Sequence, residues 1–209
     1  MKSHKSIYEK IKESLNDLPG EFAHSEMFPK RRVSSEEIKS VTNYRTSAVL
    51  ALFYEDNGTK LILTQRQHYK GNHGGQVSFP GGKMEDADES TIHTALRETH
   101  EEIGADPTQI EILGKLTDVY IPVSRFLVHP YIGIYKGIPN FTPEEREVQE
   151  IFAFDPELLL DVTIRQKRDI KTAQGLVIKD IPCFIINDKI VWGATALMLN
   201  EIKMMLERG

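Results

Sequence analysis

Apolar residues at helical spacing open the chain: Ile7, Ile11, Leu15 and Leu18. This spacing predicts an amphipathic helix over Ser6–Asp17, which Pro19-Gly20 ends. Further along, Ser34-Ser35-Glu36-Glu37 fits a capping box, which predicts the start of a short second helix. We therefore interpret residues 1–40 as an N-terminal helical extension.

The pattern changes at Tyr44, where runs rich in β-branched and aromatic residues begin. Thr46–Tyr54 and Lys60–Thr64 flank the turn sequence Asp56-Asn57-Gly58, which predicts a hairpin. Further strands are predicted at Ile110–Leu116, Phe126–Lys136, Glu150–Phe154 and Ile181–Ile185. Helices are predicted at Glu89–Ile103, with a cap near Asp88 and an end at Gly104, and at Ala194–Arg208, with at most a short helix at Glu157–Leu160. Strands mixed with two long helices favour an α/β domain over residues 41–209.

Composition narrows the class of protein. The chain has 209 residues, 40% of them hydrophobic, and a net charge of −5, which is typical of a globular protein and unfavourable for bulk binding of nucleic acid. No apolar run approaches the ~18 residues of a membrane span, and the first residues lack the apolar core of a secretory signal. The single cysteine, Cys183, excludes an internal disulfide framework. We expect a cytoplasmic protein without a membrane partner.

The segment Pro80–Gly104, PGGKMEDADESTIHTALRETHEEIG, carries the candidate chemistry. On a helix, Glu98, Glu101 and Glu102 fall within an arc of roughly 100°. A separate apolar stripe is expected from Ile92, Leu96, Thr99 and Ile103. Two carboxylates ~6 Å apart repel by roughly 3 kcal/mol at an effective dielectric of 20. The crowding therefore indicates either a solvated acidic face or neutralisation by a hard divalent cation such as Mg²⁺ or Mn²⁺.

The same segment resembles the Nudix box, in which a glycine precedes a glutamate and an Arg-Glu…Glu-Glu…Gly series. The residues that match in register are Glu89, Arg97, Glu98, Glu101, Glu102 and Gly104. Gly82 matches with one extra residue before Glu89, and Thr99 stands where an aliphatic residue is usual. The resemblance implies the Nudix α/β/α sandwich, with a mixed sheet, the box helix on one side and Ala194–Arg208 in a helical layer on another.

Other motifs resemble the coenzyme A pyrophosphatase subgroup of Nudix hydrolases, over roughly residues 42–205. They are Leu63-Thr64, Gly75–Gly82, Tyr120–Ser124, Val128-His129-Pro130, Glu147-Val148 before Ile151-Phe152, and Trp192–Ala196. The chain departs from that subgroup at Gln67, where a serine is usual, and at Gly71, where an arginine is usual.

The resemblance implies a role for each site residue. Glu98, Glu101 and Glu102 would bind the metal beside Gly82, and Arg97 would orient them by pairing with Glu101 or Glu89. A distal glutamate often completes the site in this family, and Glu147 is our choice, although the catalytic base stays open between Glu147 and a box glutamate. The residues expected to bind substrate are Arg45, Arg66, Lys70 and Gly81.

The implied reaction is hydrolysis of a diphosphate, dependent on Mg²⁺ or Mn²⁺, in which water attacks one phosphorus. The subgroup implies coenzyme A or an acyl thioester as substrate, cleaved to 3′,5′-ADP and (acyl-)4′-phosphopantetheine. Three alternatives stay open: a Nudix enzyme for ADP-ribose or a dinucleoside polyphosphate, a non-catalytic nucleotide sensor, and a purely structural module. The expected partner is a small nucleotide, and the N-terminal helix could support a homodimer.

Overall fold

A computed structural model of the chain describes residues 5–28, 43–68, 74–172 and 175–208. Its centre is a mixed sheet in the order β3-β2-β1-β7-β5. These strands are β1 (Arg45–Glu55), β2 (Thr59–Arg66), β3 (Val77–Ser78), β5 (Ile110–Lys115) and β7 (Phe126–Tyr135). Three more strands pair with them: β4 (Gly81–Lys83) with β1, β6 (Val119–Ile121) with β7, and β8 (Val148–Phe154) with β2.

The strands β1 and β7 form the middle of this sheet and run parallel to each other. β1 and β2 form the predicted antiparallel hairpin, with Phe53 opposite Leu61. β1 also pairs with the short β4 through Ala48 and Gly82, which brings the Gly81-Gly82 turn to the central strand. Buried apolar residues on both faces of β1 explain why its sequence reads as a nearly continuous hydrophobic run.

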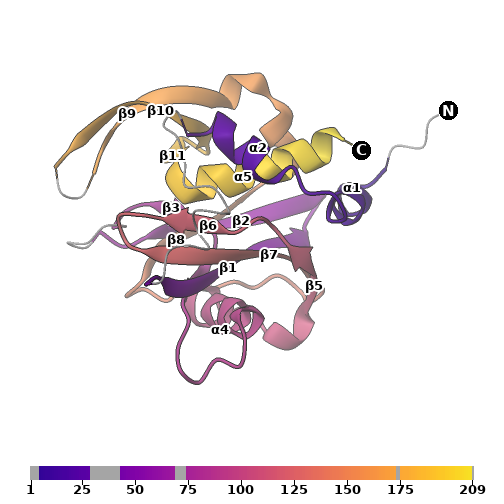
Figure 1. Ribbon diagram of the computed structural model, residues 1–209. Helices are drawn as coiled ribbons and strands as arrows, with labels where there is room; N and C mark the ends of the chain where they lie inside the picture. The colour runs from indigo at the N-terminus through magenta and orange to yellow at the C-terminus, as the bar shows by residue number, and fades with distance from the viewer. Residues whose placement is uncertain (1–4, 29–42, 69–73, 173–174, 209) are drawn as a thin grey trace.

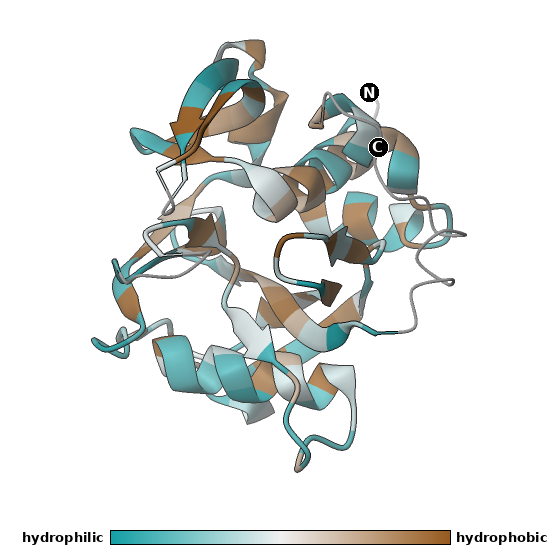
Figure 2. Cartoon of the chain, turned by 60° about the vertical axis from the view of Figure 1, so that its left-hand side comes forward, coloured by the Kyte–Doolittle hydropathy of each residue, from teal (hydrophilic) through white to brown (hydrophobic). Residues whose placement is uncertain are grey.

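Helices cover both faces of the sheet, as the sequence predicted (Figure 1). Helix α4 (Thr91–Ile103) lies on one face, over a core that includes Leu50, Leu52 and Ile62. On the other face lie α1 (Ile7–Ser14), α2 (Gly20–Glu26) and α5 (Gly193–Glu207), over a second core. Figure 2 shows hydrophilic colour concentrated on α4 and hydrophobic colour on the strands. The α/β/α architecture is therefore confirmed.

The N-terminal helices belong to the second core. Ser6 caps α1 through its side chain. Gly20, which was expected to end the first helix, has φ +55° and is the first residue of α2. Ile11 of α1 and Met27 after α2 are fully buried in the cluster that includes α5. The apolar side of α1 is thus used within the chain, while the expected homodimer and the domain boundary near residue 40 stay predictions. The capping box at residues 34–37 lies outside the described residues.

A second, three-stranded sheet follows β8 in the chain and was not predicted from the sequence. It consists of β9 (Arg165–Lys171), β10 (Val177–Ile186) and β11 (Lys189–Val191), all antiparallel. The predicted strand Ile181–Ile185 is the buried half of β10, and Cys183 is fully buried there. Short 3₁₀ helices occupy Pro107–Gln109, Pro156–Leu160 and Val162–Ile164. Among the described helices, none is long and apolar enough to cross a membrane.

The buried face of α4 differs from the expected apolar stripe. Ser90 is its N-cap, and Gly104 ends it with φ +70° as predicted, whereas Asp88 lies before the cap. The residues of α4 that are buried are Thr94, Ala95, Thr99, Glu102 and Ile103. Ile92 is exposed, because the helix is rotated so that Glu102 points into the protein. The predicted separation of an apolar face from a carboxylate face is therefore wrong for Ile92 and Glu102.

Candidate active site

The turn at Gly81-Gly82 forms the floor of the site. Gly81 has φ +148°, and a side chain there would place Cβ 2.3 Å from the Ala48 carbonyl oxygen. This close approach lets the Gly81 N–H donate to Oε2 of Glu102 at 3.1 Å. At Gly82 an added Cβ would lie 2.3 Å from a carboxylate oxygen of Glu98. Gly81 is therefore required by the backbone of β1, and Gly82 by the Glu98 carboxylate that packs on it.

Among the acids of α4, Glu102 is buried and Glu98 is partly buried. The Glu98 side chain is 14% exposed and that of Glu102 is 3% exposed. Burial raises the pKa of Glu102 to about 7, against the opposing effect of the Arg66 charge. Burial also raises the pKa of Glu98, although Arg97 opposes the shift. Like-charge repulsion adds to both shifts: Glu101 and Glu147 raise the pKa of Glu98, and Glu98 and Glu147 raise that of Glu102. A bound cation would relieve this repulsion.

Arg97 is clamped by Asp88. Its Nε and Nη2 each donate to one carboxylate oxygen of Asp88 at 2.9 Å, and the ion pair holds the pKa of Asp88 well below its usual range. Asp88 also accepts from the Thr94 hydroxyl and the Glu85 N–H. Nη1 of Arg97 remains directed at Glu98 and Glu101, at 3.0 and 2.9 Å. The guanidinium is thereby fixed against the carboxylate cluster.

Of the two partners expected for Arg97, Glu101 pairs with it, but Asp88 takes the place given to Glu89. Glu89 is exposed on the surface before α4. The sequence contained evidence for Asp88. The box places an acid after its glycine, and that spacing counted forward from Gly82 reaches Asp88. The spacing between that acid and the box arginine, counted back from Arg97, reaches Glu89 instead. The structure follows the count from the glycine, because the buried pocket beside Thr94 accepts the shorter acid.

The three predicted metal ligands do not share one orientation. The Glu101 side chain is 57% exposed and turned toward Arg97, while Glu98 and Glu102 lie on the glycine turn. In the part of the chain that the structure describes, no group of three or more His, Cys, Asp or Glu is arranged to hold a metal ion. The donors themselves fit a hard divalent cation: they are carboxylate oxygens, from one buried and one partly buried side chain that repel each other. In this structure the positive charge beside these carboxylates comes from Arg66, which pairs with Glu102, and from Arg97, which pairs with Glu98 and Glu101.

A loop from another part of the chain closes the site. The Glu144 N–H donates to the Glu102 carbonyl at 3.0 Å, which ties the loop to the end of α4. The Gln67 N–H donates to the Glu147 carbonyl at 2.8 Å, which ties it to the end of β2. The charge of Glu147 raises the pKa of both Glu98 and Glu102, so this carboxylate lies close to them. The structure thus brings Glu147 near Glu98 and Glu102, and its role as the distal acid stays a prediction.

The predicted substrate-binding residues are placed differently. Nη1 of Arg66, at the end of β2, lies 3.2 Å from Oε1 of Glu102, inside the site. Arg45 instead donates to the Ser124 carbonyl and stacks on the Phe126 ring, 4.0 Å from its centroid. Gly81 lies in the floor, as described above. Lys70, like Gly71, falls outside the described residues.

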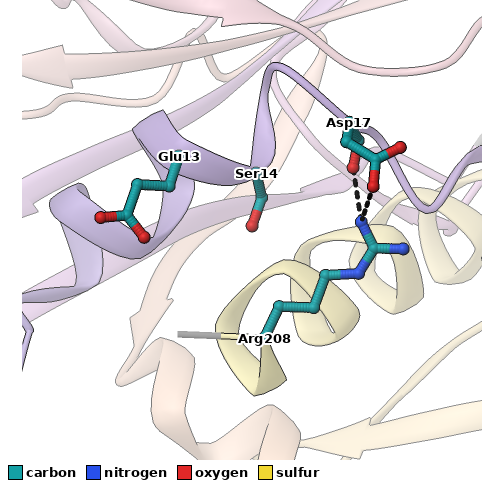
Figure 3. Close-up of a pocket in the computed structure, with 4 residues that line it drawn as sticks. All are labelled: Glu13, Ser14, Asp17 and Arg208. Carbon is teal, nitrogen blue, oxygen red and sulfur yellow. Dashed lines mark hydrogen bonds and ion pairs between the residues drawn. The ribbon is translucent and has the colours of Figure 1, made fainter.

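A small surface pocket lies elsewhere, between α1 and the end of α5. It is lined by Glu13, Ser14, Asp17 and Arg208, and Arg208 pairs with Asp17 across it (Figure 3). The helices that form it cover the face of the sheet opposite α4. Since Arg208 already neutralises Asp17 there, we assign the chemistry to the carboxylate cluster on α4.

Comparison with known proteins agrees with this geometry. The family model of the NUDIX domain matches residues 44–174. An uncharacterized Nudix hydrolase, NudL, from Pectobacterium atrosepticum is 31% identical over 169 residues, which cover 81% of this chain and 86% of that protein. The mitochondrial coenzyme A diphosphatase NUDT8 from Homo sapiens is 33% identical over 167 residues, which cover 78% of this chain and 70% of that protein.

A solved structure supports the fold. The crystal structure of a MutT/nudix family protein from Enterococcus faecalis aligns with 90% of this chain and 74% of its own, with a TM-score of 0.52 and 15% sequence identity.

Proposed function

The chain belongs to the Nudix family of hydrolases, which act on phosphoric anhydride bonds, and we propose that it cleaves the diphosphate of coenzyme A or of an acyl-coenzyme A. The products are 3′,5′-ADP and 4′-phosphopantetheine or its acyl form. The observation that carries the reaction class is the pair of carboxylates, the partly buried Glu98 and the buried Glu102, packed on the Gly81-Gly82 turn.

Nudix hydrolases generally use divalent metal ions, and Mg²⁺ or Mn²⁺ is the proposed cofactor here. Glu98 and Glu102, joined by Glu101 and the backbone at Gly82, are the residues proposed to hold it. When bound, such an ion supplies Lewis-acid polarisation of the phosphoryl oxygens and acidifies the attacking water. Asp88 and Arg97 keep the carboxylates oriented. Glu147, whose charge acts on both Glu98 and Glu102, is one candidate to accept the proton of the attacking water, and a box glutamate is an equal candidate.

The substrate assignment rests on two observations outside the box. One is the group of motifs around β3, β6 and the start of α5 that resemble coenzyme A pyrophosphatases. The other is the relative named coenzyme A diphosphatase, which is 33% identical. An arginine in the site, Arg66, has the planar donor geometry that suits a diphosphate.

A substrate panel tests the proposal. Purified protein with Mg²⁺ is incubated separately with coenzyme A, acetyl-coenzyme A, ADP-ribose and a dinucleoside polyphosphate, and the products are identified by mass. We expect 3′,5′-ADP from the first two. Absence of that product together with rapid turnover of ADP-ribose would replace coenzyme A by the second candidate substrate. That candidate is favoured by Gln67, whose side chain donates to the Glu145 carbonyl where the subgroup usually has serine.

Carboxylate variants separate catalysis from mere ligand binding. Glu98→Gln and Glu102→Gln are expected to reduce kcat by about 10²-fold or more, because each removes a charged ligand that is buried or partly buried. Glu101→Gln is expected to be milder, because this side chain is mostly exposed and bound by Arg97. Glu145→Gln, an exposed acid on the distal loop, is the matched control. A nucleotide sensor would show no turnover at all in the unmodified protein.

A further inference from the structure

Glu102 already has a counter-ion within the chain. Arg66 Nη1 lies 3.2 Å from one oxygen of the carboxylate, and the Gly81 N–H donates to the other at 3.1 Å. The Glu102 side chain is almost fully buried, whereas the Arg66 side chain is 23% exposed. Arg66 therefore lies at the boundary between the buried acid and solvent, where a substrate would enter.

The Arg66 guanidinium and a divalent cation compete for the same carboxylate. Both are positive and would repel each other at contact distance in a poorly solvated site. The backbone of Arg66 is fixed: its N–H donates to the Gln76 carbonyl at 3.0 Å, and the next residue is bonded to the Glu147 carbonyl. A cation on Glu102 would consequently displace only the end of the Arg66 side chain. The displaced guanidinium would still lie beside the site, and its paired donors match a phosphate.

We propose that Arg66 exchanges partners during binding: it neutralises Glu102 in the metal-free protein and contacts the diphosphate of the substrate once a divalent cation has taken its place. This inference rests on the proposed function. It assigns Arg66 two successive roles and makes cation binding a condition for full affinity toward the diphosphate.

The test measures binding, without turnover, in full-length protein and in Arg66→Met. Mn²⁺ affinity is measured by electron paramagnetic resonance at the same pH for every protein. We expect Arg66→Met to bind Mn²⁺ about fivefold more tightly, because the competing charge is gone. Calorimetry with ADP, a simple nucleoside diphosphate, is run with and without Mn²⁺. Without Mn²⁺ we expect both proteins to bind ADP equally weakly, and with Mn²⁺ we expect the variant to bind at least about tenfold more weakly.

Two further variants keep the result interpretable. Arg66→Lys retains the charge and is expected to bind Mn²⁺ as the unmodified protein does, with ADP affinity between the two. Arg165→Met removes another arginine paired with a glutamate, Glu26 at 2.9 Å in the other helical layer, and is expected to change neither affinity. If Arg66→Met unfolds, the Mn²⁺ and ADP affinities of Arg66→Lys decide the question.

Three outcomes overturn the inference. Weaker Mn²⁺ binding in Arg66→Met would mean that Arg66 only positions Glu102. An equal loss of ADP affinity with and without Mn²⁺ would mean that Arg66 is available to the nucleotide from the start. Unchanged ADP affinity with Mn²⁺ would mean that it never contacts the diphosphate. In each case the unmodified protein would still hydrolyse coenzyme A; if it does not, the proposed function fails instead.

Discussion

Asp88 and Arg97 form a two-point ion pair, with both carboxylate oxygens accepting from the guanidinium at 2.9 Å. The Asp88 side chain is almost fully buried, and Arg97 is the link between it and the carboxylates on α4. Because the pair is anchored before the helix begins, it fixes Arg97 relative to the turn at Gly82. The orientation of Glu98 and Glu101 thus depends on Asp88, an acid that lies before the helix begins.

Asp88→Asn is expected to destabilise the protein by about 3 kcal/mol, because the partly buried Arg97 loses its one buried charged partner. The same variant is expected to lower kcat, since Arg97 no longer holds Glu98 in place. Urea unfolding and steady-state kinetics measure the two effects. Glu89→Gln, the neighbouring exposed acid, is the control and is expected to leave both unchanged. Equal damage from the two variants would show that the box register runs through Glu89 instead.

Gly81→Ala is expected to lower the stability of the protein, whereas Gly82→Ala is expected to lower its activity. At Gly81 the new Cβ meets backbone atoms of Ala48 and Val49, and the positive φ adds strain, so we expect a loss of about 3 kcal/mol or more of stability. At Gly82 the new Cβ meets only the end of the Glu98 side chain, which can move. We therefore expect Gly82→Ala to remain folded and to lose most of its activity.

Gly175→Ala supplies the control for both variants. Gly175 has φ +82°, but an added Cβ there has no atom within 4 Å. It should cost about 1 kcal/mol of backbone strain and leave kcat unaltered. Thermal unfolding with activity assays on the three proteins separates strain, backbone clash and displacement of Glu98. Full activity in Gly82→Ala would contradict the placement of Glu98 on the turn.

The raised pKa of Glu102 leads us to expect that the metal-free protein loses stability as the pH rises toward 7. Its pKa of about 7 lies above the ordinary glutamate value, so between about pH 4.5 and 7 the folded state binds more protons than the unfolded state. Stability from this group is therefore present at low pH and lost as pH rises toward 7, by up to about 3 kcal/mol. Asp88, whose pKa is lowered, acts in the opposite direction only below about pH 4.

Chemical unfolding at several pH values between 5 and 8, in the presence of a chelator, measures this slope. Glu102→Gln should remove most of it, because the amide does not titrate. Glu157→Gln, which changes an exposed acid in the 3₁₀ helix Pro156–Leu160, should retain it. If Glu102→Gln and the unmodified protein show the same slope, burial of the Glu102 charge is not the cause.

Local patterns in the sequence predicted most of the fold. The hairpin of β1 and β2 and the long helices α4 and α5 were recognised because their periodicity or turn residues are strong. β9 was not, because its sequence RQKRDIK has one buried apolar residue, Ile170, and looks like a solvated loop. Its strand conformation depends on pairing with β10, which single-strand patterns do not encode.

The site was predicted in part for a related reason. The box glutamates follow from spacing along one helix, whereas Arg66 and Glu102 are 36 residues apart and meet only because α4 packs over β1 and β4, beside the end of β2. The burial of Glu102 and the exposure of Ile92 likewise follow from how α4 rotates on the sheet. Helical periodicity gives the positions of side chains relative to one another around a helix, but packing against the sheet determines which of them are buried.

The extension at the N-terminus provides the last prediction. His24 of α2 lies 3.0 Å from Glu201 of α5, and both side chains are buried. Ten residues of α5 are buried because the sheet covers one side and α1 and α2 the other. A protein beginning at residue 43 should therefore lose its cooperative unfolding transition, as judged by circular dichroism. Deletion of residues 1–5, before the cap of α1, should have no effect. An unchanged midpoint for the longer deletion would make the extension a separate appendage.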